Sequence, residues 1–290
     1  LLSKKLQGNN YVIDNYLFKN KDKITVGSID TGAGTTDVMI NNYSLNNEHK
    51  TINIKPDPLY WDSFKLAGDD LLKEVIQQII IEGNINSDSD IGCTGVIENY
   101  AKEKGIEKVS EKLNGFFGQD SNNIGFVAKM MRKAFIHQVA IPIAIYYLNN
   151  ANKNEGEIVS FEHIIGKEFK NKELIVYFEK HFGFNFLDIK WKISSQKINA
   201  IAGSIFDSLI KQLCLVLNQY ECDYIVLSGK PCSLNSMEEL FLKYLAVSPN
   251  NLVNLNKYWI GKWFPFSDNR GFVEDPKTMV SVGAIIALMS

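Results

Sequence analysis

The sequence is poor in the residues that build metal centres and disulfide frameworks. It contains only four cysteines and four histidines among its 290 residues. No two cysteines form a C-x-x-C pair, and none lies at metal-ligand spacing from a histidine. We assign the histidines no role in a site. Buried free thiols in a reducing compartment are the expected state of Cys93, Cys214, Cys222 and Cys232.

An excess of charge of one sign is also lacking. The chain has 31 Lys and Arg residues against 33 Asp and Glu residues, for a formal net charge of -2. Surfaces that bind nucleic acids or anionic membranes are usually strongly basic. We therefore expect no nucleic-acid partner, although this balance says nothing against a local phosphate site.

Long apolar runs and targeting signals are missing as well. The longest apolar stretches, such as Ile141 to Leu148, are far shorter than the ~20 residues of a membrane-spanning helix. Residues 1–5 have neither the charged nor the apolar region of a signal peptide. We expect a cytoplasmic protein without a membrane span. The absent initiator Met and the apolar pattern at residues 285–290 predict a piece of a longer protein.

What is present is an ordinary globular composition. Hydrophobic residues make up 45% of the chain and charged residues 22%, which is close to the average for soluble domains. A length of 290 residues fits one large domain or two small ones.

Three strands and a helix are predicted in the N-terminal part. Residues 24–30 form a short apolar run that ends at a carboxylate, 36–43 are β-branched and apolar, and 51–54 alternate. Tight turns between them predict a meander. The Gly68-Asp69-Asp70 segment then opens a helix, with an aspartate as its cap.

The remaining chain divides into a region that is hard to interpret and a regular C-terminal region. We expect residues 83–193 to be a mostly helical insertion or subdomain, with helices near 96–113, 127–148 (broken near Pro142), 160–170 and 172–181. The C-terminal region predicts a helix over 194–220, a buried strand over 223–227, a turn at 228–231, a helix over 235–244, an edge strand over 252–255 and a small-residue helix over 277–289.

The strongest chemical signal is the segment from Asp30 to Asp37, which reads Asp-Thr-Gly-Ala-Gly-Thr-Thr-Asp. A carboxylate ends a buried strand, and glycines follow where a tight turn brings backbone N–H groups close to a ligand. Threonine hydroxyls add donors, so the turn can hold a phosphate without a basic side chain. Asp30 would face that phosphate through a magnesium ion or a water, because a bare carboxylate repels it.

Taken alone, this segment is also compatible with a plain β-hairpin. It is not a Walker loop, because no Gly-Lys-Ser/Thr follows. It is not a dinucleotide fingerprint either, because a strand follows it and not a helix.

The segment Ile29 to Ile40 resembles the second phosphate motif of the superfamily of actin, heat-shock chaperones and sugar kinases. Three further segments resemble that superfamily in the same order. Residues 64–70 resemble the chaperone segment that opens a helix, 224–233 resemble the adenosine motif, and 278–288 resemble the second connecting helix at the interdomain hinge.

The resemblance covers residues 24–82 and 194–290, with residues 1–23 as a leader from a preceding domain. It implies an α/β, ribonuclease-H-like domain with a mixed five-stranded sheet and helices on both faces. It also implies ATP or ADP with Mg as ligands, Asp30 acting on magnesium through water, and a glycine at 229 because a side chain would displace adenine or ribose. The implied nucleotide-binding residues are Gly32, Ala33, Gly34, Thr35, Thr36, Gly68, Asp69, Ser228, Gly229 and Lys230.

The combination of Asp30–Asp37, Leu227–Ser233 and Asp275–Thr278 also resembles the bacterial virulence factor SrfB family, which implies a bacterial protein. No second Asp-x-Gly hairpin precedes Asp30, so the first phosphate loop is expected on a missing N-terminal domain of the same protein. Without that domain we expect an ATPase half-site that cannot hydrolyse ATP.

A rival interpretation is a non-catalytic scaffold that keeps the fold for protein interaction. Ala33, in place of the usual middle glycine, and Lys230, where a second glycine is common, favour this alternative. The dense aromatic group at residues 258–266 is either a loop packed on a core or a docking surface for another domain.

Overall fold

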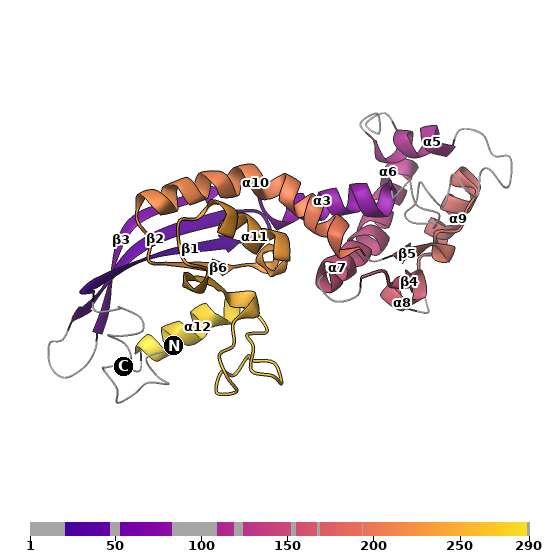
Figure 1. Cartoon of the computed structure of the whole chain (residues 1–290). Coiled ribbons are helices and arrows are strands. Elements are labelled where there is room, and N and C mark those ends of the chain that lie inside the picture. The colour runs from indigo at the N-terminus through magenta and orange to yellow at the C-terminus, as the bar shows by residue number, and fades with distance from the viewer. Residues whose placement is uncertain are drawn as a thin grey trace. The chain divides into compact units, whose positions relative to one another are not determined.

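The computed structural model describes residues 21–46, 53–82, 109–118, 124–151, 155–166, 169–192 and 194–288. The chain divides into two compact units (Figure 1). The first unit comprises Leu1–Asp70 and Ala202–Ser290, and the second comprises Leu71–Ile201. Most of the leader expected at 1–23 lies outside the described residues.

The first unit is built on a five-stranded mixed sheet with the order β3-β2-β1-β6-β7. β1 (Lys23–Thr31), β2 (Thr36–Asn46) and β3 (Asn53–Phe64) are joined as an antiparallel meander. β6 (Tyr224–Ser228) lies parallel to β1, and β7 (Leu252–Asn254) lies parallel to β6. The predicted α/β class, with a meander and two added parallel strands, is confirmed.

The third strand is much longer than residues 51–54, the range that alternation predicts. β3 continues to Phe64 through Pro56 and Pro58. It is an edge strand, where a residue without an N–H group can be tolerated. The register with β2 shifts between Ile40 and Asn41, next to these prolines. Because proline has a low strand propensity, the sequence pattern did not predict this part of the strand.

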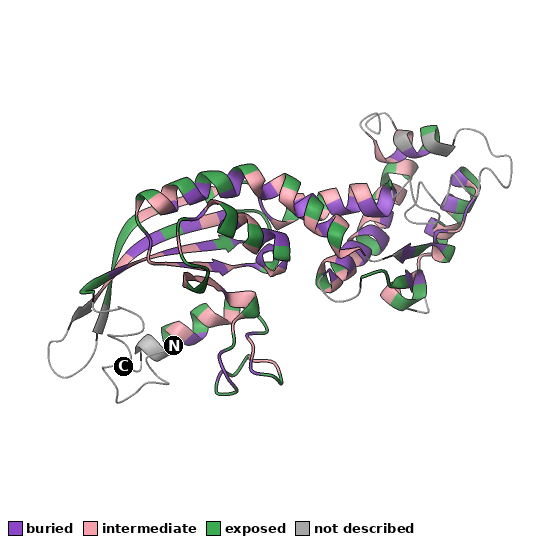
Figure 2. Ribbon diagram, in the orientation of Figure 1, coloured by how far each residue is buried: buried purple, intermediate pink, exposed green. Residues whose placement is uncertain are grey.

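One face of the sheet is buried under α10 (Ser195–Gln219). Ile29 pairs with Val38 and with Leu227, so the three side chains share this face, and all are at most 1% exposed. Buried residues recur along the strands of the sheet (Figure 2). At Gly27 a Cβ atom would collide with the side chain of Leu217 on α10. The helix therefore lies close against β1, and each large aliphatic side chain buried there contributes about 1.5–3 kcal/mol.

The opposite face is open over its outer strands. Ser28, Met39 and Trp61 are paired across three strands, and Met39 and Trp61 are 42% and 67% exposed. Helices were expected on both faces, but the described residues place none over this part of the second face.

α10 also bears on the expected absence of a membrane span. It is the one helix among the described residues that is long and apolar enough to cross a membrane, judged by length and composition alone. Core helices pass the same test, and 44% of its apolar window is buried within the protein. Packing against the sheet accounts for part of the apolar character of α10.

Two further helices begin where the sequence predicts them. α3 (Gly68–Val75) begins at the predicted Gly-Asp-Asp segment and continues into a π-helix, η3 (Ile76–Ile81). α11 (Asn235–Tyr244) has the predicted bounds and follows a short 3-10 helix, η7 (Lys230–Ser233). Ser194 caps α10, because its Oγ accepts from the Lys197 N–H at 3.2 Å.

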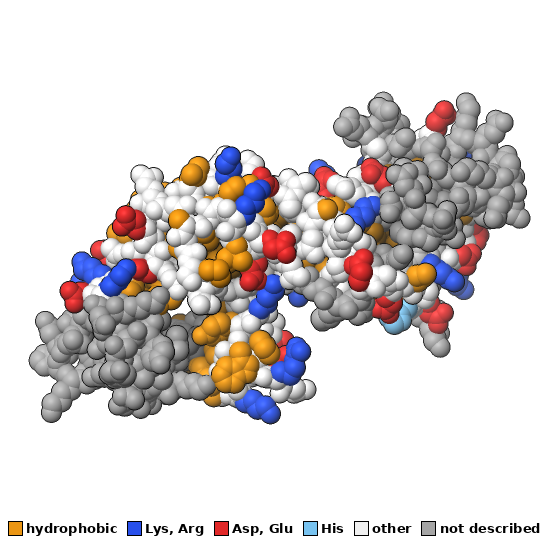
Figure 3. Space-filling view, in the orientation of Figure 1, with side chains coloured by type: hydrophobic (Ala, Val, Ile, Leu, Met, Phe, Trp, Pro, Cys, Tyr) orange, Lys and Arg blue, Asp and Glu red, His pale blue; other side chains and the backbone are white. Residues whose placement is uncertain are grey.

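The segment after β7 has a small core of its own. It begins with η9 (Leu255–Lys257) and ends in α12 (Lys277–Leu288), whereas η8 (Pro249–Asn251) lies just before β7. The aromatic group is partly core and partly surface, because Phe264 is buried whereas Trp259 is 53% exposed. Apolar side chains gather on the surface of this segment (Figure 3). The small core consists of Ile260, Phe264, Val273 and Val282.

The second unit is mostly helical and has an aromatic core around Phe135, Phe178 and Phe186. The chain is not broken near Pro142; it passes through a π-helix and places the proline in the first turn of α7, where its missing N–H is tolerated. The helix expected at 96–113 is described only as α5, and residues 96–108 lie outside the described residues. The pairing of β4 with β5 was not predicted. The elements are α5 (Val109–Phe117), α6 (Phe126–Phe135), η5 (Ile136–Ala140), α7 (Ile141–Asn150), β4 (Ile158–Ser160), α8 (Phe161–Ile165), α9 (Lys172–Phe182), η6 (Phe186–Asp188) and β5 (Lys190–Lys192).

Candidate functional site

The turn between β1 and β2 is tied directly to the start of α3. The Gly32 N–H donates to the Thr35 carbonyl at 2.8 Å and closes the turn. The Gly68 N–H then donates to the Gly32 carbonyl at 2.9 Å, and the Asp69 N–H donates to the Ala33 carbonyl at 2.7 Å. The first N–H groups of a helix have no partner within the helix. Here the hairpin uses two of them, so Gly68 and Asp69 support the turn.

The two threonines of the turn have different surroundings. Thr36 is 1% exposed, and its hydroxyl donates to the Leu66 carbonyl at 2.7 Å. Thr35 is exposed, and its hydroxyl donates to Asp37 at 3.2 Å. Ala33 and Gly34 are also exposed. The surface of the turn that a ligand can reach is therefore Ala33, Gly34 and Thr35.

Asp30 lies at the carboxyl end of β1, where the sheet brings three polar side chains together. Its Oδ1 accepts from the Ser228 hydroxyl at 2.8 Å. The register also places Asp37 directly opposite Asp30, which puts both carboxylates on one face of the sheet. Like charges in such a pair repel each other, so a cation near them would be favoured. Asp37 was not among the predicted site residues, although it ends the Asp30–Asp37 segment; the strand register places it beside Asp30.

A magnesium ion fits this arrangement only if other ligands complete its shell. No group of three or more His, Cys, Asp or Glu side chains that could hold a metal is found among the described residues. Asp30 and Asp37 supply oxygen ligands of the kind that magnesium prefers, and phosphates and waters usually fill its remaining positions. The donor set therefore suits an ion that arrives with a phosphorylated ligand.

Gly229 is required by the fold at this position. Its φ is +89°, and a Cβ atom would lie 2.6 Å from the Thr31 carbonyl carbon and 2.9 Å from the Thr31 nitrogen. The space that a side chain would occupy is filled by β1. The glycine therefore brings the turn against β1, and the structure favours a backbone requirement over an open space for adenine. Lys230 follows it with an exposed side chain.

Behind this turn is a buried cluster without obvious reactivity. The Cys232 Sγ lies 3.7 Å from the Thr31 Oγ1, and both side chains are at most 1% exposed. Burial raises the pKa of the Cys232 thiol to about 12. A thiol so far from ionisation is a poor nucleophile, so the predicted buried, unreactive state fits Cys232.

Two asparagines that the sequence did not single out hold the same turn from the other side. Asn256 Nδ2 donates to the Gly229 carbonyl at 2.9 Å, and Asn254 Nδ2 donates to the Cys232 carbonyl at 2.7 Å. The only signal available in the sequence was an asparagine that ends the short apolar run of β7.

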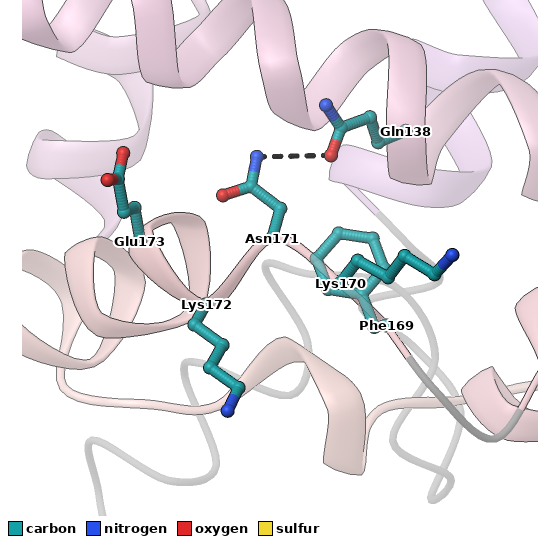
Figure 4. Close-up of a pocket in the computed structure, with 6 residues that line it drawn as sticks. All are labelled: Gln138, Phe169, Lys170, Asn171, Lys172 and Glu173. Atoms are coloured by element: carbon teal, nitrogen blue, oxygen red, sulfur yellow. Dashed lines mark hydrogen bonds between the residues drawn. The ribbon is translucent and has the colours of Figure 1, made fainter.

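The second unit has an open depression of about 840 Å³ that contains none of these residues. Asn171 and Gln138 point toward each other and are joined by a 3.1 Å hydrogen bond, whereas the ammonium groups of Lys170 and Lys172 point apart (Figure 4). The polar groups do not converge on a common point, so we assign no ligand to this depression.

Comparison with known proteins identifies a family. No curated protein matches the chain. The model of the family described as virulence factor SrfB matches residues 14–290, which is nearly the whole chain. The chain therefore belongs to the SrfB virulence factor family.

Proposed function

We propose that the first unit binds an adenine nucleotide with magnesium, as one half of an actin-like ATPase. The observation that carries the proposal is the meeting of the hairpin at 30–36 with the turn at 228–230, joined by the hydrogen bond between Ser228 and Asp30. Both segments follow strands that run parallel, β1 and β6. In open α/β sheets, ligands bind at the carboxyl ends of such strands.

The sheet supports a ribonuclease-H-like assignment within this proposal. Its three-stranded meander is extended by two parallel strands in the order β3-β2-β1-β6-β7. A mixed five-stranded sheet is what the resemblance to actins and chaperones implies.

In this proposal the candidate residues have two roles, contact with the ligand and support of the turns. Ala33, Gly34 and Thr35 would contact phosphate oxygens, and Asp30 would act on magnesium through a water. Ser228 and Lys230 would border the nucleoside or the outer phosphates. The supporting residues are Gly32, Thr36, Gly68, Asp69 and Gly229, whose backbone or hydroxyl groups are engaged within the protein.

Hydrolysis would require a second domain. Phosphoryl transfer needs positioning and charge neutralisation on both sides of the γ-phosphate, and the hairpin supplies one side. We expect phosphate release by this chain alone to be near background.

The last helix has apolar side chains that are exposed to solvent. In α12, Val280 and Ile285 are 77% and 56% exposed. This exposure favours a protein partner, such as the N-terminal domain that the resemblance implies.

The alternative is a scaffold that has lost nucleotide binding. It is favoured by one specific observation, the use of the Gly68 and Asp69 N–H groups by the hairpin, which leaves fewer donors for phosphate. The exposed Trp259 and Trp263 would then belong to the principal binding surface.

Titration of the ¹⁵N-labelled chain with ATP in the presence of magnesium would decide between the two. We expect amide shifts at residues 33–35 and 228–230 that disappear when magnesium is chelated. Guanosine triphosphate is the comparison ligand that tests recognition of the base, and pyrophosphate is the one that tests recognition of the phosphates. Absence of shifts at millimolar ATP in a folded chain would leave the scaffold as the better explanation.

A further inference from the structure

We infer that Asn254 and Asn256, here called the asparagine pair, are positioning residues that fix the turn at 228–232. The ligand side of this inference rests on the proposed function. The Asn256 amide donates to the Gly229 carbonyl at 2.9 Å, and the Asn254 amide donates to the Cys232 carbonyl at 2.7 Å. The two bonds bracket the residue with the exposed cation, Lys230.

The asparagine pair is itself held in place. The Asn256 N–H and Nδ2 both donate to Asn254 Oδ1, at 3.2 Å and 3.3 Å. Asn254 is only 7% exposed, and its Nδ2 also lies 3.3 Å from Glu238 Oε2. Glu238 is paired with Lys257 at 2.8 Å. A side chain fixed by its own network can define the position of the groups that it bonds.

The bonds determine the orientation of the turn as well as its position. A trans peptide is planar, so holding the Gly229 carbonyl fixes the whole peptide that joins Gly229 to Lys230. Thr31 already restricts Gly229 from the opposite side, at 2.6 Å from the position of a Cβ atom. The turn therefore lies between β1 and the asparagine pair. Releasing the pair would let the turn move away from β1 and draw Ser228 away from Asp30.

The same sheet provides a matched control at its other end. Asn251, just before β7, donates through Nδ2 to the Asp223 carbonyl, just before β6, at 2.8 Å. This bond joins the same two strand regions with the same chemistry but at the amino ends. Each end of the sheet also has a buried thiol that can report on it. Cys232 lies in the turn held by the asparagine pair, Cys222 precedes Asp223, and the two are 0% and 5% exposed.

The first test needs no ligand. Asn256→Ala and Asn251→Ala are treated with an alkylating reagent under native conditions, and labelling of each cysteine is followed by mass spectrometry of its peptide. We expect Asn256→Ala to accelerate labelling of Cys232 by roughly tenfold through local opening, with Cys222 unchanged. Asn251→Ala should not accelerate Cys232. Equal Cys232 rates in Asn256→Ala and the unmodified chain would overturn the inference.

The second test measures the ligand side. Binding of ATP with magnesium should weaken by about tenfold in Asn256→Ala and stay within twofold in Asn251→Ala, with melting curves recorded for both. Undiminished affinity in folded Asn256→Ala would remove the positioning role. If the unmodified chain binds no nucleotide, the proposed function fails, and the Cys232 labelling alone decides the inference.

A second variant covers the case in which Asn256→Ala does not fold. Asn256→Asp keeps the shape of the side chain and replaces the donor to Gly229 with an oxygen that repels its carbonyl. We expect the same acceleration of Cys232 labelling. A folded Asn256→Asp protein with slow Cys232 labelling would count against the asparagine pair.

Discussion

Gly229 and Gly34 lie in neighbouring turns but have opposite environments. Gly229 has a φ of +89° and Thr31 backbone atoms in the space of a Cβ, whereas nothing lies within 4 Å of that position at Gly34. We expect Gly229→Ala to lower the free energy of unfolding by about 2–4 kcal/mol, because strain and collision add. Gly34→Ala should change it by less than about 1 kcal/mol.

Urea unfolding of the two variants checks this prediction, with the unmodified chain beside them. A Gly229→Ala protein as stable as Gly34→Ala would mean that the turn does not lie against β1. Gly229→Val is consequently not a clean test of nucleotide binding, since loss of binding would follow from loss of the fold.

Asp30 offers a cleaner test of the site. Its carboxylate is exposed, and its one hydrogen-bond partner among the described residues is Ser228, which an asparagine can still satisfy. We expect Asp30→Asn to leave the melting temperature nearly unchanged and to weaken magnesium-dependent ATP binding by about tenfold or more, because the carboxylate charge that acts on the ion through a water is lost. Calorimetric titration with and without a chelator provides the measurement.

The same measurements can also show that Asp30 has a structural role. A large loss of stability with unaltered binding would make Asp30 a structural residue. Ser228→Ala is the companion variant, because it removes the hydrogen bond and leaves the carboxylate charge in place.

At the scale of elements, the joint between the hairpin and α3 makes a prediction about hydrogen exchange. Amides in the first turn of a helix usually exchange quickly because they lack partners within the helix. The Asp69 amide donates to the Ala33 carbonyl at 2.7 Å, so we expect it to exchange as slowly as amides in the middle of α3. Gly68→Ala should accelerate it, because the new Cβ would lie 2.9 Å from the Gly32 carbonyl oxygen.

Amide exchange followed by mass spectrometry or NMR gives the answer directly. Rapid exchange at Asp69 in the unmodified chain would show that the hairpin does not hold the helix. In that case the α3 N–H groups would be free for phosphate after all, and the assignment of Gly68 and Asp69 as supporting residues would be wrong.

At the scale of the whole molecule, the three buried thiols within the described part of the chain make the free energy of unfolding depend on alkaline pH. Burial raises the pKa of Cys214 and Cys232 to about 12 and that of Cys222 to about 11, from an ordinary value near 9. Because the pKa values in the folded state are raised, their full contribution is present below about pH 9. It declines as the pH rises toward the folded values, by about 1.4 kcal/mol per pH unit for each thiol.

Urea unfolding between pH 8 and about pH 10.5 tests this dependence. Tyrosines and lysines titrate in the same range, so the informative quantity is the difference between the chain and Cys232→Ala. We expect a shallower decline in the variant. Identical slopes would mean that Cys232 is accessible to solvent in the folded state.

Much of the first unit follows from sequence pattern alone. Apolar runs, glycine turns and a serine cap determine β1, β2, β6, α10 and α11, because these signals act over a few neighbouring residues. The prolines of β3 hid that strand, since tolerance of proline depends on lying at a sheet edge. Sequence patterns also could not identify the roles of Asn254 and Asn256, because their hydrogen-bond partners are the carbonyls of residues more than twenty positions earlier.

The sequence by itself determined which residues could form a phosphate turn and in what order the elements come. Only the tertiary structure decided which of them remain available to a ligand. Thr36, Gly68 and Gly229 match the motif as well as Thr35 and Gly34 do. However, the Thr36 hydroxyl and the Gly68 N–H donate to the carbonyls of Leu66 and Gly32, and the backbone of Thr31 fills the space beside Gly229. The physical reason is that a motif specifies chemical types along the chain, whereas burial and hydrogen bonding depend on segments brought together from distant positions.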